Sequence, residues 1–201
     1  MGLRMHERRA HIRSQRPRIE IRGMGQHIED DALIQKLQTI EIDKLPTHVR
    51  LIQYKQARRI IEQNHYLGYA PCGCKFCLGI FADSELVGVM IWGHPIARME
   101  EQENTLELTR MFLFDSPKNS ESRALSLAEK WIKQNRTERR LIAYSDTAEG
   151  HLGVIYRAAN WKLIKEVRAE TWIRTGRDRK GMIGGKKLKF ERCMRTSIVR
   201  Q

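Results

Sequence analysis

The sequence contains no run of about 18 apolar residues, the length that an α-helix needs to span a bilayer. Its N-terminal segment is rich in arginine and lacks the apolar core of a secretory signal. It also has no long basic amphipathic helix with bulky apolar residues, which is the pattern of proteins that bind a membrane surface. These absences predict a cytoplasmic protein that does not bind membranes.

Acidic residues are outnumbered: 24 Asp and Glu stand against 37 Lys and Arg, for a net charge of +13 and a pI near 9.9. A field of this sign attracts polyanions. Since the sequence argues against a membrane surface, we expect nucleic acid as the partner.

A length of 201 residues suits one domain, and apolar residues make up 41% of the chain. A core can therefore be buried without disulfides or a structural metal. We predict a basic N-terminal arm at 1–28, a folded catalytic domain at 29–174 and a basic, Gly-rich C-terminal extension at 175–201. Both basic segments can lie along phosphates, and both also fit solvated tails.

Cysteines are few, and three of the four lie together in the segment Cys72-Gly-Cys-Lys-Phe-Cys77. In a reducing compartment such a cluster suggests a metal site. Structural zinc normally takes four ligands from paired motifs, and no second motif follows. The alternative is that Cys77, beside Leu78, is simply buried in a strand.

Apolar periodicity predicts alternating strands and helices along the middle of the chain. The predicted strands cover residues 49–54, 76–81, 86–92, 106–114, 141–144 and 163–173. Helical spacing is seen at 57–64, 120–132 and 154–159. The polar connection at 82–85 is short enough for an antiparallel hairpin. This order predicts an α/β fold with a mixed sheet covered by helices.

One candidate site is the turn that leads from the strand ending near Leu113 into the helix at 119–123. A helix N-terminus presents unpaired amides and a positive dipole, which can bind a phosphate or pyrophosphate. The alternative is that Asn119 or Ser120 only caps the helix and that Arg110 only pairs with an acid.

A second candidate is the strand end Tyr144-Ser145-Asp146. Ligands of open α/β sheets sit beyond the carboxyl ends of strands, so Asp146 is placed to reach a substrate amine. Tyr156, ten residues later on a helix, can face the same crevice. Spacing alone equally allows Asp146 to be a helix cap and Tyr156 to be a packing residue.

A third candidate is the pair His65-Tyr66, in the loop after the first predicted helix. Such a pair can ligate a transition metal, stack on a base or handle a proton. Most lone histidines do none of these, and His94 and His151 are weaker candidates still.

Several motifs occur in an order that resembles the Mom family of phage DNA-modification proteins, over roughly residues 48–174. They are Leu-Thr-Arg at 108–110, Asn-Ser-Glu-Ser at 119–122, Tyr-Ser-Asp at 144–146, Gly-His at 150–151 and Ile-Tyr-Arg-Ala-Ala-Asn-Trp at 155–161. The resemblance implies a fold related to the GNAT acyltransferases, with a mostly antiparallel mixed sheet flanked by helices. It also implies conversion of adenine in double-stranded DNA to N6-carbamoylmethyladenine, which shields phage DNA from restriction in the host cytoplasm.

The resemblance also implies the site residues. The catalytic set would be Asp146, Tyr156, Arg110 and Ser122, and the donor would be bound by Asn119, Ser120, Ser122 and Arg123. His65 and Tyr66 would hold iron, with Tyr156 as a further ligand. A homodimer is an open alternative for the assembly.

Two features depart from ordinary acetyltransferases. The Gly-x-Gly or Gly-x-Ala pyrophosphate loop is absent from residues 119–123, which leaves the donor open between acetyl-CoA and another acyl carrier. A carbamoylmethyl group is attached through carbon, so simple acyl transfer does not complete the reaction. The alternatives are a conventional acetyl-CoA-dependent N-acetyltransferase and a non-catalytic DNA-binding protein.

The resemblance and the residues suggest a mechanism. Adenine flips out of the duplex, because its N6 is out of reach inside the stack. Asp146 then orients or deprotonates N6, while Arg110 stabilises negative charge and Tyr156 donates a proton or stacks on the base.

Overall fold

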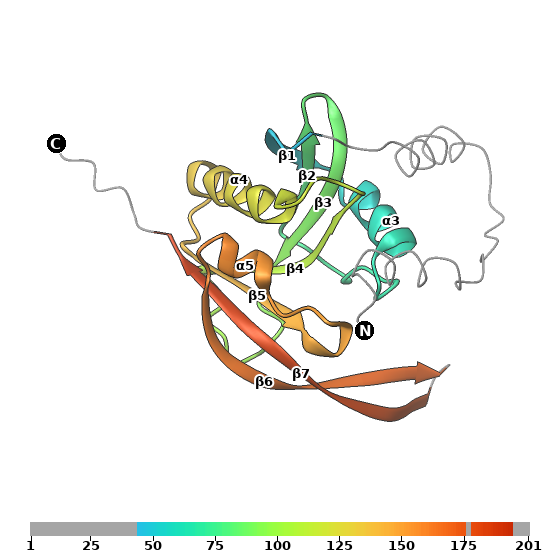
Figure 1. The fold of residues 1–201 in the computed structure, drawn as a ribbon. Coiled ribbons are helices and arrows are strands. Elements are labelled where there is room, and N and C mark those ends of the chain that lie inside the picture. The colour runs from blue at the N-terminus through green and yellow to red at the C-terminus, as the bar shows by residue number, and fades with distance from the viewer. Residues whose placement is uncertain (1–43, 176–177, 195–201) are drawn as a thin grey trace, which may run out of the picture. The chain divides into compact units, whose positions relative to one another are not determined.

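The computed structural model describes residues 44–175 and 178–194 (Figure 1). The predicted arm at 1–28 and residues 195–201 of the predicted extension lie outside the described residues. The described strands are β1 (His48–Ile52), β2 (Phe76–Ala82), β3 (Glu85–Gly93), β4 (Thr105–Leu113), β5 (Arg140–Asp146), β6 (Lys162–Thr175) and β7 (Asp178–Cys193). They form one sheet in the order β1-β2-β3-β4-β5-β7-β6.

Only β4 and β5 run parallel among these neighbours, and every other adjacent pair is antiparallel. The prediction of a mixed, mostly antiparallel sheet is confirmed. β2 and β3 form a hairpin whose strand residues are all buried except Glu85. Asp83 turns the hairpin with a φ of 52°, a left-handed conformation that aspartate tolerates better than most residues.

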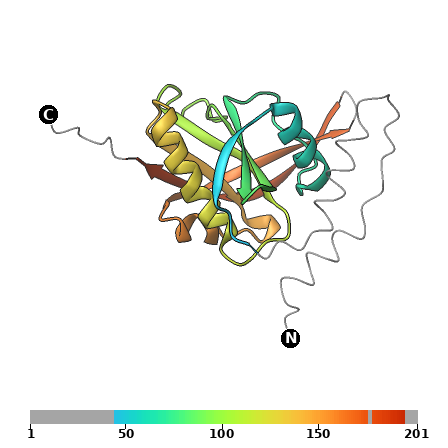
Figure 2. The same ribbon diagram turned by 90° about the horizontal axis from the view of Figure 1, so that it is seen from above.

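Helices cover both faces of the sheet (Figure 2). Helix α3 (Tyr54–Asn64) packs against one face through Ala57, Ile60 and Ile61. Helix α4 (Ser120–Asn135) and the short α5 (Val154–Ala158) lie together on the other face. No helix in the described parts of the chain is both long enough and apolar enough to cross a bilayer.

The C-terminal boundary of the folded domain differs from the prediction. Residues 178–193 were expected to belong to a basic extension, but they form β7, which lies between β5 and β6. Leu188 and Phe190 alternate with Lys187 and Lys189, so the two apolar side chains share one face of the strand, and Phe190 is fully buried there. On the other face Lys189 is also buried, because it forms an ion pair with Glu100. Acidic partners thus allow a lysine-rich strand to sit inside the sheet.

Glu138, between α4 and β5, is a buried carboxylate whose ion pairs join two loops. Lys75 Nζ and an Arg136 guanidinium nitrogen each lie 2.9 Å from its Oε1. Burial by itself raises the pKa of Glu138, but the hydrogen bonds from Arg136 and Lys75 outweigh burial and lower this pKa to about 2. The ionised form is therefore the one that the fold stabilises.

We expect Glu138→Gln to lower the free energy of unfolding at pH 7 by roughly 2–3 kcal/mol. A carboxyl pKa that is depressed by folding contributes stability above its unfolded value near 4.5, and this contribution is lost as the pH falls toward 2. Urea unfolding at pH 7 and at pH 3 should therefore show a smaller gap between variant and parent at the lower pH. A gap that does not depend on pH would contradict this assignment.

Candidate active site

A β-bulge in β4 creates a split in the sheet. Arg110 lies opposite Ile91 and Leu108 lies opposite Trp92, so Thr109 is an extra residue in β4. The Thr109 hydroxyl donates to the Ile91 carbonyl at 3.0 Å. The parallel pairing of β4 with β5 ends one residue earlier, at Leu108 and Ala143. Beyond this point each strand keeps only its outer neighbour, β3 or β7.

The split is lined by polar residues that share one face of the sheet. Because side chains alternate along strands, the pairing places Glu107 and Arg110 of β4 on the same face as Tyr144 and Asp146 of β5. This face continues onto β7, where Lys187 lies opposite Asp146. The opposite face carries apolar residues and packs on α4 and α5.

Arg110 is held by the loop that follows α3. Its guanidinium donates to the carbonyl oxygens of Thr109, at 2.6 Å, and Tyr69, at 3.2 Å. The guanidinium carbon also lies 4.9 Å from the centre of the Tyr69 ring, a cation–π distance. None of the ion pairs of the described residues involves Arg110. Pairing with an acid, the alternative weighed for it, is therefore not its role in this structure.

Asp146 ends β5 and caps the 3-10 helix η1 (Thr147–Glu149). Its Oδ1 accepts from the Ala148 amide at 3.1 Å, and its Oδ2 lies 3.8 Å from Lys187 Nζ. The predicted capping alternative is thus observed, and it fixes the carboxylate at the strand end. Its side chain is 16% exposed, which leaves part of it open to a ligand.

Tyr66 lies near enough to this carboxylate to be affected by its charge. Its ring stacks on His65, with centres 4.5 Å apart, and is tilted against His151 at 5.4 Å. Burial and, to a lesser degree, the charge of Asp146 raise the pKa of Tyr66 to about 12, although Arg110 acts in the opposite sense. The phenol is therefore neutral near pH 7 and can donate a hydrogen bond.

Tyr156 reaches the split from the α5 side. It is buried and stacks on Phe190 of β7, with ring centres 5.0 Å apart. Gly153 makes this packing possible, since its φ of 71° suits glycine and the Phe190 ring fills the space of the missing Cβ. Burial raises the pKa of Tyr156, and the nearby Tyr66 and Glu107 add to the effect.

Glu107 is a site residue that sequence reasoning missed. It is 4% exposed, and its Oε2 accepts from the Ile96 amide at 2.9 Å. Burial raises its pKa, although Ile96 and the positive charges of Arg110 and Lys187 oppose this shift. The sequence signal is a single acid inside the apolar run Leu106-Glu-Leu108. Burying a charge costs free energy, so an acid in a buried strand indicates a structural or functional role.

The residues predicted to bind the donor gather at the start of α4. Asn119, Ser122 and Arg123 line a hollow of about 310 Å³ together with Leu45, Ser126 and Ala158. Asn119 adopts a left-handed conformation and makes no side-chain cap, so the first-turn amides are not capped by it. Ser120 is buried, and its hydroxyl has no hydrogen-bond partner among the described residues.

The structure thus divides the predicted catalytic set. Arg110, Asp146 and Tyr156 meet around Tyr66 at the split. Ser122 instead lines the α4 hollow, where its hydroxyl donates to the Asn119 carbonyl at 3.0 Å. The two places are linked by α5, which carries both Tyr156 and Ala158.

The structure gives no support to iron at the predicted ligands His65 and Tyr66. The His65 ring stacks on Tyr66, and its Nδ1 accepts from the Leu67 amide at 3.2 Å. Among residues 44–175 and 178–194, no three His, Cys, Asp or Glu side chains are grouped to hold a metal ion. The cysteine cluster is a close thiol pair, with Cys74 Sγ and Cys77 Sγ 3.6 Å apart, while Cys72 is exposed.

Comparison with solved structures identifies the fold. Arabidopsis thaliana NAA60 in complex with a bisubstrate analogue superposes with a TM-score of 0.53 at 11% identity, covering 74% of this chain and 98% of that one. A probable acetyltransferase from Staphylococcus epidermidis gives 0.51 at 12% identity, covering 73% and 98%. The ribosomal-protein-S5-alanine acetyltransferase of Vibrio fischeri gives 0.50 at 12% identity, covering 72% and 91%. The predicted GNAT-like fold is confirmed.

The sequence has a relative in the methylcarbamoylase mom of Escherichia phage Mu, with 34% identity over 118 residues. The match covers 54% of this chain and 49% of the phage protein, so it spans about half of that relative. The model of the Mom protein family matches residues 46–193, a range that includes the split, the α4 hollow and β7. This chain therefore belongs to the Mom protein family.

Proposed function

We propose that this chain is a transferase that converts adenine in double-stranded DNA to N6-carbamoylmethyladenine and so protects phage DNA from restriction. The observation that carries the proposal is the split in the sheet, where Arg110, Asp146, Tyr66 and Tyr156 converge from four separate elements. The name of the phage Mu relative, a methylcarbamoylase, supports the chemistry. The net charge of +13 supports a polyanionic substrate.

The acceptor side of the reaction follows from the polar face. Adenine is flipped out of the duplex so that its N6 reaches the split. Asp146 is held by Ala148 and Lys187, so it orients N6 by accepting one of its hydrogens. Glu107, whose pKa is raised by burial, accepts the released proton. Tyr66 and Tyr156 stay neutral and donate hydrogen bonds, and Arg110 stabilises the negative charge that develops on the donor as N6 attacks its acyl carbon and the carrier leaves. This transfer forms an N6-acyl bond, and the carbon-linked carbamoylmethyl group arises in a later step to which none of these residues is assigned.

The donor side is the hollow at the start of α4. The N-terminus of a 16-residue helix favours anions, and Arg123 adds a positive charge beside it. We assign this hollow to the phosphates of an acyl donor, acetyl-CoA or another acyl carrier, bound by Asn119, Ser120, Ser122 and Arg123. No step of the proposed reaction is assigned to iron at His65 and Tyr66.

Ser120→Ala tests the donor site. Removing a buried hydroxyl that lacks a partner should leave the melting temperature unchanged or raise it slightly. If the hydroxyl serves the donor, the same change should weaken binding of coenzyme A several-fold in titration calorimetry. Ser84→Ala, in the exposed β2–β3 turn outside the hollow, is the control and should bind coenzyme A as the parent does. Equal affinity in all three proteins would remove Ser120 from the donor site.

The proposed function is tested by mass spectrometry of nucleosides from plasmid DNA of cells that express the chain. We expect an adenine nucleoside heavier by one carbamoylmethyl group, which is absent from cells without the chain. If adenine stays unmodified while the folded protein acetylates amines with acetyl-CoA, the chain is a conventional N-acetyltransferase, the alternative that its fold favours. If it only retains DNA, it is a binding protein.

A further inference from the structure

Strands β6 and β7 continue well past the rest of the sheet. Strand β5 pairs with β7 only over Lys187–Cys193, whereas β6 and β7 pair with each other out to Thr175 and Asp178. Residues 168–175 and 178–186 thus form a two-stranded ribbon, which Figure 1 shows extending beyond the other strands. A ribbon without a third strand is marginally stable in water, so binding to a partner would stabilise it.

The charge of the ribbon indicates which partner. It contains five basic and two acidic residues: Arg168, Arg174, Arg179, Lys180 and Lys186, against Glu170 and Asp178. The register places Arg168 opposite Lys186 and Arg174 opposite Arg179. Facing basic residues and an excess of three positive charges favour a bound anion. The ribbon is therefore suited to a polyanion.

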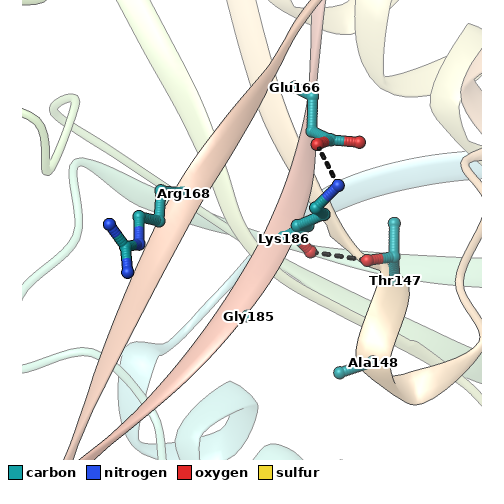
Figure 3. A pocket seen from close by; sticks show the side chains of 6 residues that line it. All are labelled: Thr147, Ala148, Glu166, Arg168, Gly185 and Lys186. Atoms are coloured by element: carbon teal, nitrogen blue, oxygen red, sulfur yellow. Dashed lines mark hydrogen bonds and ion pairs between the residues drawn. The ribbon is translucent and has the colours of Figure 1, made fainter.

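The base of the ribbon adjoins the split. The Thr147 hydroxyl donates to the Lys186 carbonyl at 2.7 Å, and the next residue, Lys187, faces Asp146. A hollow of about 620 Å³ opens here, lined by Thr147, Ala148, Glu166, Arg168, Gly185 and Lys186 (Figure 3). Lys186 pairs with Glu166 at 2.9 Å, while Arg168 points away from that pair. A polyanion bound along the ribbon would therefore reach the end of β5, where Asp146 lies.

We infer that the ribbon lies in the major groove of the substrate DNA, and that Arg168 and Lys186 at its base contact phosphates beside the flipped adenine. The inference rests on the proposed function for its choice of DNA as the polyanion. The major groove admits a two-stranded β-ribbon. At about 3.3 Å per residue, the eight residues of β6 in the ribbon extend roughly 25 Å, enough to follow the groove across several base pairs.

Binding of the full chain to a short fluorescent DNA duplex, followed by anisotropy at several salt concentrations, tests the inference. One variant combines Arg174→Gln with Arg179→Gln, and a second combines Arg168→Gln with Lys186→Gln. The control combines Lys130→Gln with Lys133→Gln, which removes the same charge from two exposed positions on α4. We expect each ribbon variant to bind about tenfold more weakly and to lose about 2 from the slope of log K against log salt. The control should stay within about twofold of the parent.

Melting curves of the ribbon variants should stay close to the parent, because the substitutions lower the positive charge of the ribbon, and the Lys186–Glu166 ion pair that one of them removes is exposed. Affinities and slopes that equal those of the control would overturn the inference. Nucleoside mass spectrometry of the same proteins separates the two proposals. If the parent modifies adenine and the ribbon variants bind DNA like the control, the ribbon assignment fails and the proposed function stands. If the ribbon variants lose binding and the parent leaves adenine unmodified, the ribbon assignment stands and the proposed chemistry fails.

Discussion

Asp146→Asn should reduce the yield of modified adenine by about 10²–10³-fold while leaving DNA binding within about twofold. The amide keeps an oxygen for the Ala148 N–H, so the cap of η1 survives. It loses the negative charge that faces Lys187 and lies beside Tyr66, and with it the strong acceptor proposed for N6. Nucleoside mass spectrometry over a time course measures the rate.

Asp83→Asn is the matched control for that experiment. Asp83 lies in the β2–β3 turn, is exposed, and pairs only with Lys44 among the described acid–base pairs. Asparagine tolerates its left-handed conformation, so the fold should not change. Equal modification rates in the two variants would show that the charge of Asp146 has no role in the reaction.

Phe190→Ala should lower the free energy of unfolding by about 3–5 kcal/mol, the largest stability effect that we expect from one substitution. The ring is fully buried, stacks on Tyr156, and occupies the space beside Gly153. Its removal leaves a cavity between β7 and α5 that neither backbone can fill. Urea unfolding measures the loss.

Two further variants sharpen this prediction. Phe190→Leu keeps most of the volume and should recover more than half of the lost stability. Leu152→Ala removes an exposed side chain from the loop before Gly153, and should change stability by less than about 0.5 kcal/mol. A loss for Phe190→Ala no larger than that of Leu152→Ala would mean that β7 does not carry the core assigned to it.

The central part of the fold is readable from sequence because its strands are apolar. The runs that became β2 and β3 bury both faces, so composition alone marks them. Strand β7 escaped sequence reasoning for the opposite reason. Its lysines suggest a solvated tail, and only the acid Glu100, 89 residues away, makes burial of Lys189 acceptable. A local pattern holds no information about so distant a partner.

The candidate site was partly readable for a topological reason. Asp146 and Tyr156 were expected to meet because ligands bind beyond the ends of strands, and both do lie close to Tyr66. The role of Glu107 in the site was missed, because hydrophobic patterning assigns the apolar run around it to a strand and gives no information about a single acid within it. Ser122 lies in the α4 hollow, apart from Arg110, Asp146 and Tyr156, because of the path of the chain in space. The spacing of motifs in the sequence does not reveal that path.

The bulge at Thr109 makes the site depend on the number of residues between Glu107 and Arg110 in β4. In a regular strand Glu107 and Arg110, three positions apart, would point to opposite sides, and one inserted residue brings them to the same side. Deleting Thr109 would keep every other amino acid yet turn Arg110 toward the apolar layer. The number of residues in β4, as well as their chemistry, therefore determines on which face of the sheet the Arg110 guanidinium lies.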